Sequence, residues 1–278
     1  MSKDTTGTLY VVGTPIGNLD DLSPRARQVL NAVGLIAAED TRRTRGLLSS
    51  IGVKKRLIAY HGHNEAQQTP VLIAKLLSSE SIALVSDAGV PLISDPGLVV
   101  VRAARKAAIP VVSIPGPSAL TAALSVSGLS TERFVFEGFL PRRPGPRRSR
   151  LALLSRESRT LVFYESVHRF PDTLEALQEH LGPDRLAVIA RELTKVHESV
   201  YEGTLAELGK RMSGDILMKG EFVVMVAGNE IAHPAEDSEV TRVYELLAKE
   251  ISAKKALALT VSITGASRNR VYSLTRGG

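Results

Sequence analysis

The sequence of 278 residues contains no cysteine, and aromatic residues make up only 4% of it. The absence of cysteine excludes disulfides, thiolate metal sites and a cysteine nucleophile, and it favours a reducing compartment. Residues 1–8 lack the basic and apolar layout of a signal peptide, and no later apolar run is long enough to span a bilayer. We therefore expect a cytoplasmic protein without membrane insertion.

Several motifs of binding and catalytic sites are also missing. No G-x-x-x-x-G-K-[ST] loop occurs, which argues against an NTPase that cradles phosphates. The six histidines are scattered without the spacing of metal ligands, so we expect no metal site. The scarcity of aromatic side chains argues against RNA binding by broad base stacking.

The rest of the composition is that of a globular protein, with 44% hydrophobic and 23% charged residues. This length suffices for one large domain or two moderate ones. The net charge of +6 comes from arginines and lysines that cluster, and it suits a polyanionic partner through release of counterions. Solubility alone would also explain the charge, so both interpretations stay open.

Short apolar runs recur in the first half of the chain, each followed by a turn and a helix-like stretch. This β/α alternation predicts a parallel sheet with helices on its faces. Ser23 before Pro24 and Asp95 before Pro96 each predict a capped helix start. The runs are Leu9–Val12, Leu35–Ala38, Leu57–Tyr60, Ile82–Val85 and Val111–Ile114.

A second series of apolar runs follows Gly128 and predicts a second α/β domain. We place the boundaries at 1–128 for the first domain and 129–230 for the second. The segment Pro141–Arg150 contains five arginines, and its prolines and glycine predict an exposed, mobile, cationic loop without regular structure. The runs are Phe134–Phe139, Leu161–Tyr164, Ala187–Ala190, Ser199–Glu202 and Phe222–Val226.

The C-terminal segment, residues 239–278, predicts a small helical module after a polar linker at Asn229–Ser238. Apolar spacing indicates two helices, and a turn at Ile263–Ala266 with Ser267 as cap precedes a third, Arg268–Leu274. This arrangement is similar to a helix-turn-helix, whose last helix often meets nucleic acid. A three-helix packing module explains the same short pattern equally well.

Three turns follow predicted strands and precede predicted helices. They are Gly13–Asn18, Ser86–Gly97 and Ser113–Ala119, and open α/β sheets bind ligands at this edge. The first turn is not G-x-G-x-x-G, so it does not indicate a dinucleotide. The second is longer than a connection needs, although its aspartates and serines could simply cap turns.

Seven stretches together resemble one known family, the S-adenosylmethionine methyltransferases of the tetrapyrrole methylase type, and within it the bacterial enzymes that modify ribosomal RNA. The stretches are Leu9–Leu22 (LYVVGTPIGNLDDL), Ala38–Thr44 (AEDTRRT), Ser86–Gly97, Ser113–Ala119, Phe136–Pro141, Val162–Arg169 (VFYESVHR) and Ala190–Glu198 (ARELTKVHE).

The resemblance implies an α/β fold of two domains with the cofactor S-adenosylmethionine in the cleft between them, and a homodimer. It also implies the reaction, 2′-O-methylation of the ribose of cytidine 1402 in 16S rRNA of the small ribosomal subunit. Position by position, it implies that the cofactor is bound by Gly13, Pro15, Asp87, Ala88, Gly89, Val90, Ser118, Ala119, Tyr164, Leu193 and Glu221.

Methyl transfer depends mainly on aligning the acceptor hydroxyl with the sulfonium methyl, and a base is needed only as the hydroxyl attacks. Lys195 and Glu198 follow a strand expected to end at the cleft, and either could take that proton. Glu39, in the stretch beside Arg42 and Arg43, is a third candidate. A surface ion pair for Lys195 and a solvated helix cap for the Glu39 stretch stay open.

Phosphate contacts should dominate affinity for a substrate as anionic as RNA. We expect them from the arginines Arg42, Arg43, Arg142, Arg143, Arg147, Arg148, Arg150, Arg268 and Arg270. Two other functions remain open: an enzyme of the same fold that methylates a tetrapyrrole or another small acceptor, and a nucleic-acid-binding regulator with the α/β part as a ligand sensor.

Overall fold

A computed structural model describes residues 6–212, 214–229 and 237–275. The chain divides into a larger unit that holds both sheets and a smaller unit built mainly from the last three helices. Among the described residues, none of the helices combines the length and apolar character needed to cross a membrane.

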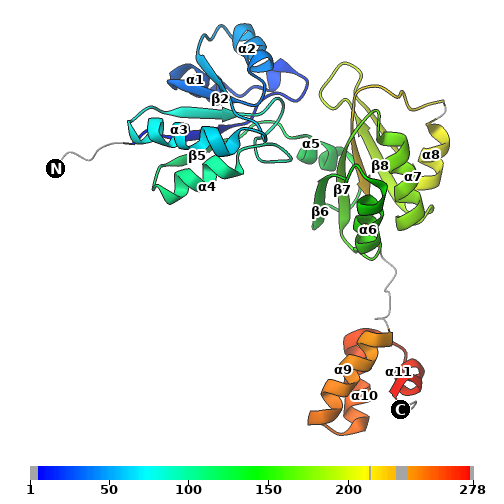
Figure 1. Cartoon of the computed structure of the whole chain (residues 1–278). Helices are drawn as coiled ribbons and strands as arrows, with labels where there is room; N and C mark the ends of the chain where they lie inside the picture. Colours follow the sequence, from blue (N-terminus) through cyan, green and yellow to red (C-terminus); the bar gives the residue numbers. More distant parts are fainter. Residues whose placement is uncertain (1–5, 213, 230–236, 276–278) are drawn as a thin grey trace. The chain divides into compact units, whose positions relative to one another are not determined.

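The first sheet is fully parallel, with the strand order β3-β2-β4-β1-β5 (Figure 1). This confirms the predicted parallel sheet, and the central strands β2 and β4 are buried along their whole length. The strands are β1 (Leu9–Val12), β2 (Leu35–Ala38), β3 (Arg56–Ala59), β4 (Ile82–Val85) and β5 (Val111–Ile114).

Helices pack on both faces of this sheet. Buried residues of α1 and α2 share one apolar cluster with β1, β2, β4 and β5, and those of α3 and α4 share the cluster on the other face. A fifth helix, α5, leads to the second sheet. The bounds are α1 (Pro24–Ala32), α2 (Thr41–Ser50), α3 (Glu65–Leu77), α4 (Leu98–Lys106) and α5 (Ala119–Val126), with a short 3-10 helix η1 (Leu19–Asp21).

One of the two predicted helix starts is confirmed and the other is wrong. The Ser23 hydroxyl accepts a hydrogen bond from the Ala26 N–H at 3.1 Å and caps α1. Asp95 caps nothing, because α4 begins only at Leu98, after Gly97 with a φ of +136°. A positive φ at Gly97 turns the chain before the helix starts, so Asp95 stays in the preceding loop.

The second sheet has the order β6-β7-β10-β8-β9 and confirms the second α/β region. Only β6 and β7 run parallel, and the other three pairs are antiparallel. The elements are β6 (Phe134–Phe139), α6 (Pro144–Leu154), β7 (Thr160–Ser166), α7 (Phe170–Leu181), β8 (Leu186–Arg191), β9 (Ser199–Thr204), α8 (Leu205–Arg211) and β10 (Glu221–Val226).

Both faces of this sheet are covered. Apolar residues of α6, α7 and α8 pack on one face. Ala123 and Leu124 of α5 pack on the other, against Val162, Val188 and Met225 (Figure 1). Helix α5 thus belongs to the first half in sequence order but completes the core of the second half. The domain boundary after residue 128 remains a prediction.

The prediction that Pro141–Arg150 forms an irregular loop is wrong, because α6 begins at Pro144. Pro144 and Pro146 occupy the first turn of α6, where backbone N–H groups have no partner within a helix. The prolines therefore cost no hydrogen bond and supply a φ suited to a helix. The arginines from Arg147 onward are consequently fixed along a helix.

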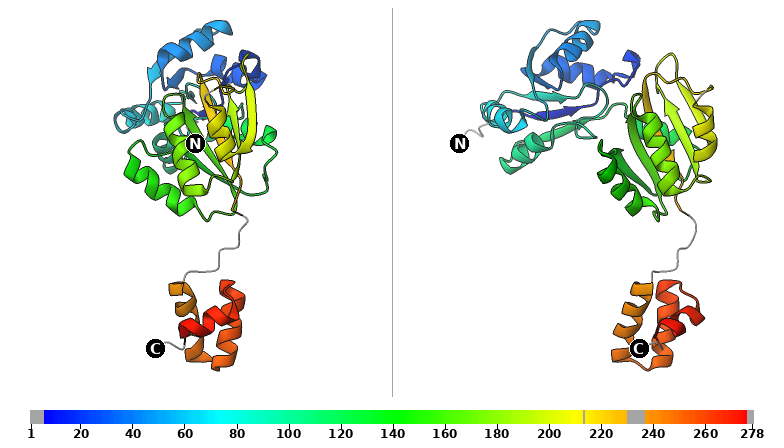
Figure 2. Two further views of the ribbon diagram at one scale, coloured as in Figure 1. Left: turned by 90° about the vertical axis from the view of Figure 1, so that its right-hand side faces the viewer. Right: turned by 45° about the vertical axis from the view of Figure 1, so that its right-hand side comes forward.

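The smaller unit is a three-helix module, α9 (Asp237–Glu250), α10 (Ala253–Thr264) and α11 (Arg268–Thr275), shown from two sides in Figure 2. Val240, Ala266 and Val271 form its core. The predicted turn is confirmed: Gly265 is left-handed at the end of α10, and the Ser267 hydroxyl accepts from the Arg270 N–H. Most of the predicted linker lies outside the described residues.

Candidate functional site

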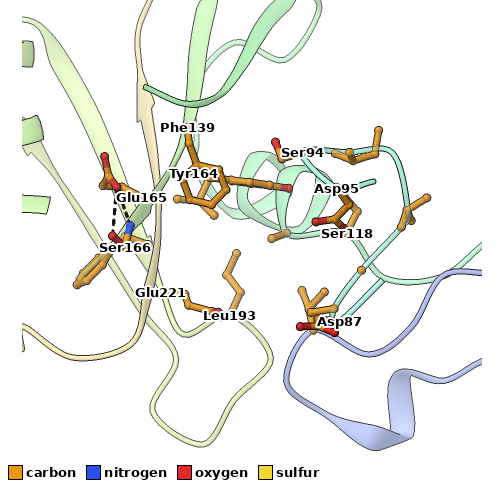
Figure 3. Close-up of a pocket in the computed structure, with 18 of the residues that line it drawn as sticks. Asp87, Ser94, Asp95, Ser118, Phe139, Tyr164, Glu165, Ser166, Leu193 and Glu221 are labelled. Carbon is orange, nitrogen blue, oxygen red and sulfur yellow. Dashed lines mark hydrogen bonds between the residues drawn. The ribbon is translucent and has the colours of Figure 1, made fainter. Parts of the chain in front are cut away.

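A pocket with a volume of about 280 Å³ lies where the strand-end turns of the first sheet face the second sheet (Figure 3). Tyr164 reaches in from β7, and Leu193 and Glu221 face Asp87 across the opening. The lining residues are Ile16, Glu39, Arg43, Asp87, Ala88, Gly89, Val90, Ile93, Ser94, Asp95, Ser118, Ala119, Phe139, Tyr164, Glu165, Ser166, Leu193, Lys195, Glu221, Phe222 and Val223.

The three predicted turns converge through close backbone contacts. A Cβ added to Gly13 would lie 2.7 Å from the backbone of Gly116, so the turns after β1 and β5 touch where neither residue has a side chain. Thr14 and Gly89 form an antiparallel bridge with N···O distances of 2.8 and 3.0 Å, which joins the turn after β1 to that after β4. Convergence follows from parallel strands ending at one edge.

Asp87 organises the acidic side of the pocket. Its backbone N–H donates to Glu39 Oε2 at 3.2 Å, and its own Oδ1 accepts from the Asp40 N–H at 2.9 Å. Arg43, from α2, is 3.5 Å from Asp87 Oδ2. The AEDTRRT stretch therefore contributes two lining side chains, Glu39 and Arg43, and holds the Asp87 loop in place.

Asp95 is held in the pocket by a strained loop. Leu92 and Ser94 have φ values of +74° and +66°, which residues other than glycine rarely adopt. At the end of the loop, Glu65 of α3 accepts a hydrogen bond from the Gly97 N–H at 2.7 Å. Burial raises the pKa of Asp95 to about 6, and the carboxylates of Glu39 and Asp87 add to the shift, while a hydrogen bond with Ser86 opposes it.

Tyr164 connects the second sheet to the start of α5. Its hydroxyl accepts a hydrogen bond from the Leu120 N–H at 3.0 Å, and its ring packs edge-on against Phe136 and Phe139. Burial raises the pKa of Tyr164, against the lowering effect of the Leu120 N–H and Ser118. The phenol is therefore neutral and positions the α5 N-terminus, where Ser118 and Ala119 line the pocket.

Lys195 lies between two carboxylates, 2.7 Å from Glu192 Oε1 and 3.0 Å from Glu221 Oε2. Burial lowers the pKa of the Lys195 ammonium, but the two carboxylates outweigh burial and the pKa is raised overall. In this arrangement Lys195 is a cation at neutral pH, which disfavours a role as proton acceptor. The pair Glu192 and Thr194, both with positive φ, presents Leu193 to the pocket between them.

The pocket brings together most of the residues expected from the resemblance. Gly13 and Pro15 lie outside the lining, and Gly13 packs against the backbone of Gly116. The residues that line it are Asp87, Ala88, Gly89, Val90, Ser118, Ala119, Tyr164, Leu193 and Glu221. Of the proposed catalytic residues, Glu39 and Lys195 line the pocket, whereas Glu198 does not and accepts a hydrogen bond from the Thr194 N–H.

Sequence reasoning missed several lining residues. The Asp95–Pro96 pattern predicts only a helix cap for Asp95, and Ile16 and Ile93 lie inside motifs for which the resemblance implies other cofactor-binding residues. The apolar lining of the second sheet, Phe139, Phe222 and Val223, gave no signal of its own because strands facing a pocket and strands facing a core have the same pattern.

The predicted RNA-binding arginines divide into paired and unpaired ones. Arg42 pairs with Asp40 at 2.8 Å, yet its side chain is 85% exposed. Arg150 forms a bidentate ion pair with Glu137, with both N···O distances at 2.6 Å, and Arg270 forms an ion pair with Asp237 at 2.6 Å. The residues that form no ion pair within the described chain are Arg142, Arg143, Arg147, Arg148 and Arg268.

Comparison with known proteins supports the fold and matches two regions of the chain. Residues 8–209 match the family of tetrapyrrole (corrin/porphyrin) methylases, and residues 234–275 match a domain described as the RsmI C-terminal HTH domain. A solved uroporphyrin-III C-methyltransferase from Thermus thermophilus, complexed with S-adenyl homocysteine, is similar with a TM-score of 0.55. It is 18% identical, and the match covers 80% of this chain and 97% of that one.

The fold and the site thus define a methyltransferase of the tetrapyrrole methylase type. Ribosomal RNA small subunit methyltransferase I of Xylella fastidiosa (strain Temecula1) is 52% identical over 96% of this chain and 98% of its own length. The protein of the same name from Pseudomonas aeruginosa is 48% identical over 96% of both chains. The chain belongs to the family of these ribosomal RNA small subunit methyltransferases I.

Proposed function

We propose that this enzyme transfers a methyl group from S-adenosylmethionine to the 2′-oxygen of cytidine 1402 in 16S rRNA of the small ribosomal subunit. The observation that carries the proposal is the 52% identity over nearly the whole length of a ribosomal RNA small subunit methyltransferase I. We further propose that the enzyme acts in the cytoplasm as a homodimer.

The lining of the pocket fits this cofactor, which carries a sulfonium and an ammonium group. Five acidic residues line it, and among them the carboxylates of Glu39, Asp87 and Glu221 suit a cationic ligand. Val90, Leu193 and Val223 supply apolar surface for a flat heterocycle, and the backbone around Gly89 can be approached closely because glycine has no side chain. When bound, S-adenosylmethionine supplies an electrophilic methyl group.

The residues of the chain hold the lining of the pocket in position. Asp87 is oriented by Glu39, Asp40 and Arg43, and Tyr164 sets the position of the Ser118–Ala119 turn. Lys195 neutralises Glu192 and Glu221, which keeps the loop that carries Leu193 closed onto the second sheet. We propose that these contacts align the cofactor, so that alignment supplies most of the rate.

For RNA binding we propose two cationic surfaces. The first is formed by Arg142, Arg143, Arg147 and Arg148 around the start of α6. The second is Arg268 on α11, beside a hollow that is also lined by Lys254 and Asn269. Arg270 is better explained as a brace between α11 and α9, because its guanidinium is paired with Asp237.

The test is methyl transfer from labelled S-adenosylmethionine to 30S subunits purified without this modification, followed by nuclease mapping of the labelled nucleotide. We expect label on a single 2′-O-methylcytidine. Absence of label while the enzyme still binds the cofactor would contradict the proposal and favour a small acceptor.

A further inference from the structure

Asp95 is placed in the pocket by a strained loop and does not cap a helix. Its loop adopts left-handed backbone conformations at two residues other than glycine, Leu92 and Ser94, and such conformations are strained. The loop also requires Gly138, where a Cβ would lie 2.7 Å from Ser94 Oγ. Backbone strain of this kind persists where the surrounding structure enforces it, and here it places one carboxylate among the lining residues.

The surroundings of Asp95 leave its carboxylate without a cationic partner among the described residues. Its neighbours are the carboxylates of Glu39 and Asp87, the hydroxyls of Ser86 and Tyr164, and, elsewhere in the lining, the cations Arg43 and Lys195. Arg43 is paired with Asp87 and Lys195 with Glu192 and Glu221, whereas Asp95 forms no ion pair among the residues that the structure describes. The raised pKa agrees with this setting.

The other candidates for a proton acceptor are less suited. Lys195 is held as a cation by its two carboxylates. Glu198 is outside the lining, and Glu39 accepts the backbone N–H of Asp87. Among these residues, Asp95 alone lines the pocket and has a pKa, about 6, that is close to neutral pH. General bases work best when their pKa is near the working pH.

We infer that Asp95 is the general base that accepts the proton of the substrate hydroxyl during methyl transfer, an inference that rests on the proposed function. The acceptor oxygen forms a bond to the methyl carbon and passes its proton to the Asp95 carboxylate. The methyl–sulfur bond breaks, and its electron pair stays on sulfur. Asp95 returns the proton to solvent before the next turnover.

The first experiment compares wild-type enzyme with Asp95→Asn, which keeps the shape and removes the base, and with Asp184→Asn, a matched change at an exposed residue outside the lining. Single-turnover transfer to 30S subunits is measured at saturating S-adenosylmethionine, and cofactor affinity is measured by calorimetry. We expect Asp95→Asn to slow transfer by roughly 10²–10⁴-fold, the usual contribution of a general base. Its cofactor dissociation constant should change less than about threefold, and Asp184→Asn should match wild type.

A second readout uses the cofactor-free protein. Because the pKa of Asp95 is raised to about 6 from 3.8, ionising this carboxyl opposes folding, so its cost is absent below pH 4 and grows as the pH rises through 6. We expect Asp95→Asn to melt above wild type at pH 8 and to lose that advantage at pH 4. Carbon-13 NMR should place the Asp95 titration near pH 6.

The outcomes separate the inference from the proposed function. If wild type labels no rRNA, the proposed function fails, and this inference fails with it. If wild type labels rRNA and Asp95→Asn does so at the same rate, only the inference is overturned. An Asp95→Asn enzyme that is slow at the cofactor concentration that saturates wild type, and recovers its rate at a higher concentration, would also overturn it, because Asp95 would then be a binding residue.

Discussion

Replacing Gly13 with alanine tests the contact that joins two of the pocket-forming turns. The added Cβ would lie 2.7 Å from the N and Cα atoms of Gly116, about 0.7 Å closer than ordinary van der Waals contact allows. Both neighbours are backbone atoms, so no side chain can rotate away, and the turns must move apart. Overpacking of this kind typically costs about 1–3 kcal/mol, and we expect the upper half of that range here.

The measurement is the melting temperature of Gly13→Ala against wild type, with Gly46→Ala as control. For a unit of this size, a loss of 2–3 kcal/mol corresponds to a fall of about 4–12 °C. Gly46 lies inside α2 with nothing within 4 Å of a built Cβ, so alanine there should raise stability by about 1 kcal/mol through helix propensity.

Gly13→Ala should also weaken the binding of S-adenosylmethionine, although Gly13 does not line the pocket. Ile16 follows Gly13, and Ser118 with Ala119 follow Gly116, so separating the two turns displaces three lining residues. We expect roughly a tenfold loss of affinity by calorimetry. A Gly13→Ala protein as stable as wild type and with unchanged cofactor affinity would refute the packing argument.

Three further predictions concern Tyr164, the arginines around the start of α6 and the arginines of α11. Tyr164→Phe leaves the Leu120 N–H without its acceptor and should cost about 1–2 kcal/mol in thermal unfolding, together with some cofactor affinity. Replacing Arg142, Arg143, Arg147 and Arg148 with glutamine should reduce the slope of log affinity for RNA against log salt by up to about 3, with cofactor affinity unchanged; an unaltered slope would remove this surface from the interface. Arg268→Ala should weaken RNA binding. Arg270→Ala should chiefly destabilise the three-helix module, by up to about 1 kcal/mol as measured by hydrogen exchange within the full chain. The reverse ranking of these two arginines would contradict the brace.

Much of the first sheet could be predicted because its signals are local. Each strand is a short apolar run bounded by a turn, and burial on both faces of β2 and β4 leaves no polar alternation that could mislead. Ser23–Pro24 marks a helix start by chemistry that lies within a few residues. The convergence of the strand-end turns follows from parallel pairing and requires no tertiary detail.

Failures occurred where a distant residue decides the local structure. Asp95–Pro96 has the same pattern as Ser23–Pro24, but Glu65 and the positive φ of Gly97 end the loop two residues later. The prolines after Pro141 predict irregular structure by their number, but Pro144 and Pro146 lie in the first turn of α6, where proline is compatible with a helix. Leu151 and Leu154, which are buried against the second sheet, supply the tertiary contacts that favour the helix.

The pocket is lined by more acidic than basic side chains, although the chain as a whole is basic. The two proposed ligands, a cationic cofactor and an anionic RNA, match these opposite charges. The chain carries +6, yet the carboxylates of Glu39, Asp87 and Glu221 in the lining outnumber the cations of Arg43 and Lys195 even before Asp95 is counted. The fifth acidic residue of the lining, Glu165, has a fully buried side chain 3.4 Å from Arg169, so its charge is neutralised away from the pocket. A cationic cofactor is therefore favoured inside the pocket, while the arginines of the surface favour an anion as large as RNA. Burial is the main cause of the raised pKa of Asp95, and because carboxylates close together also raise each other's pKa, the excess of negative charge that suits the cofactor adds to the basicity of Asp95.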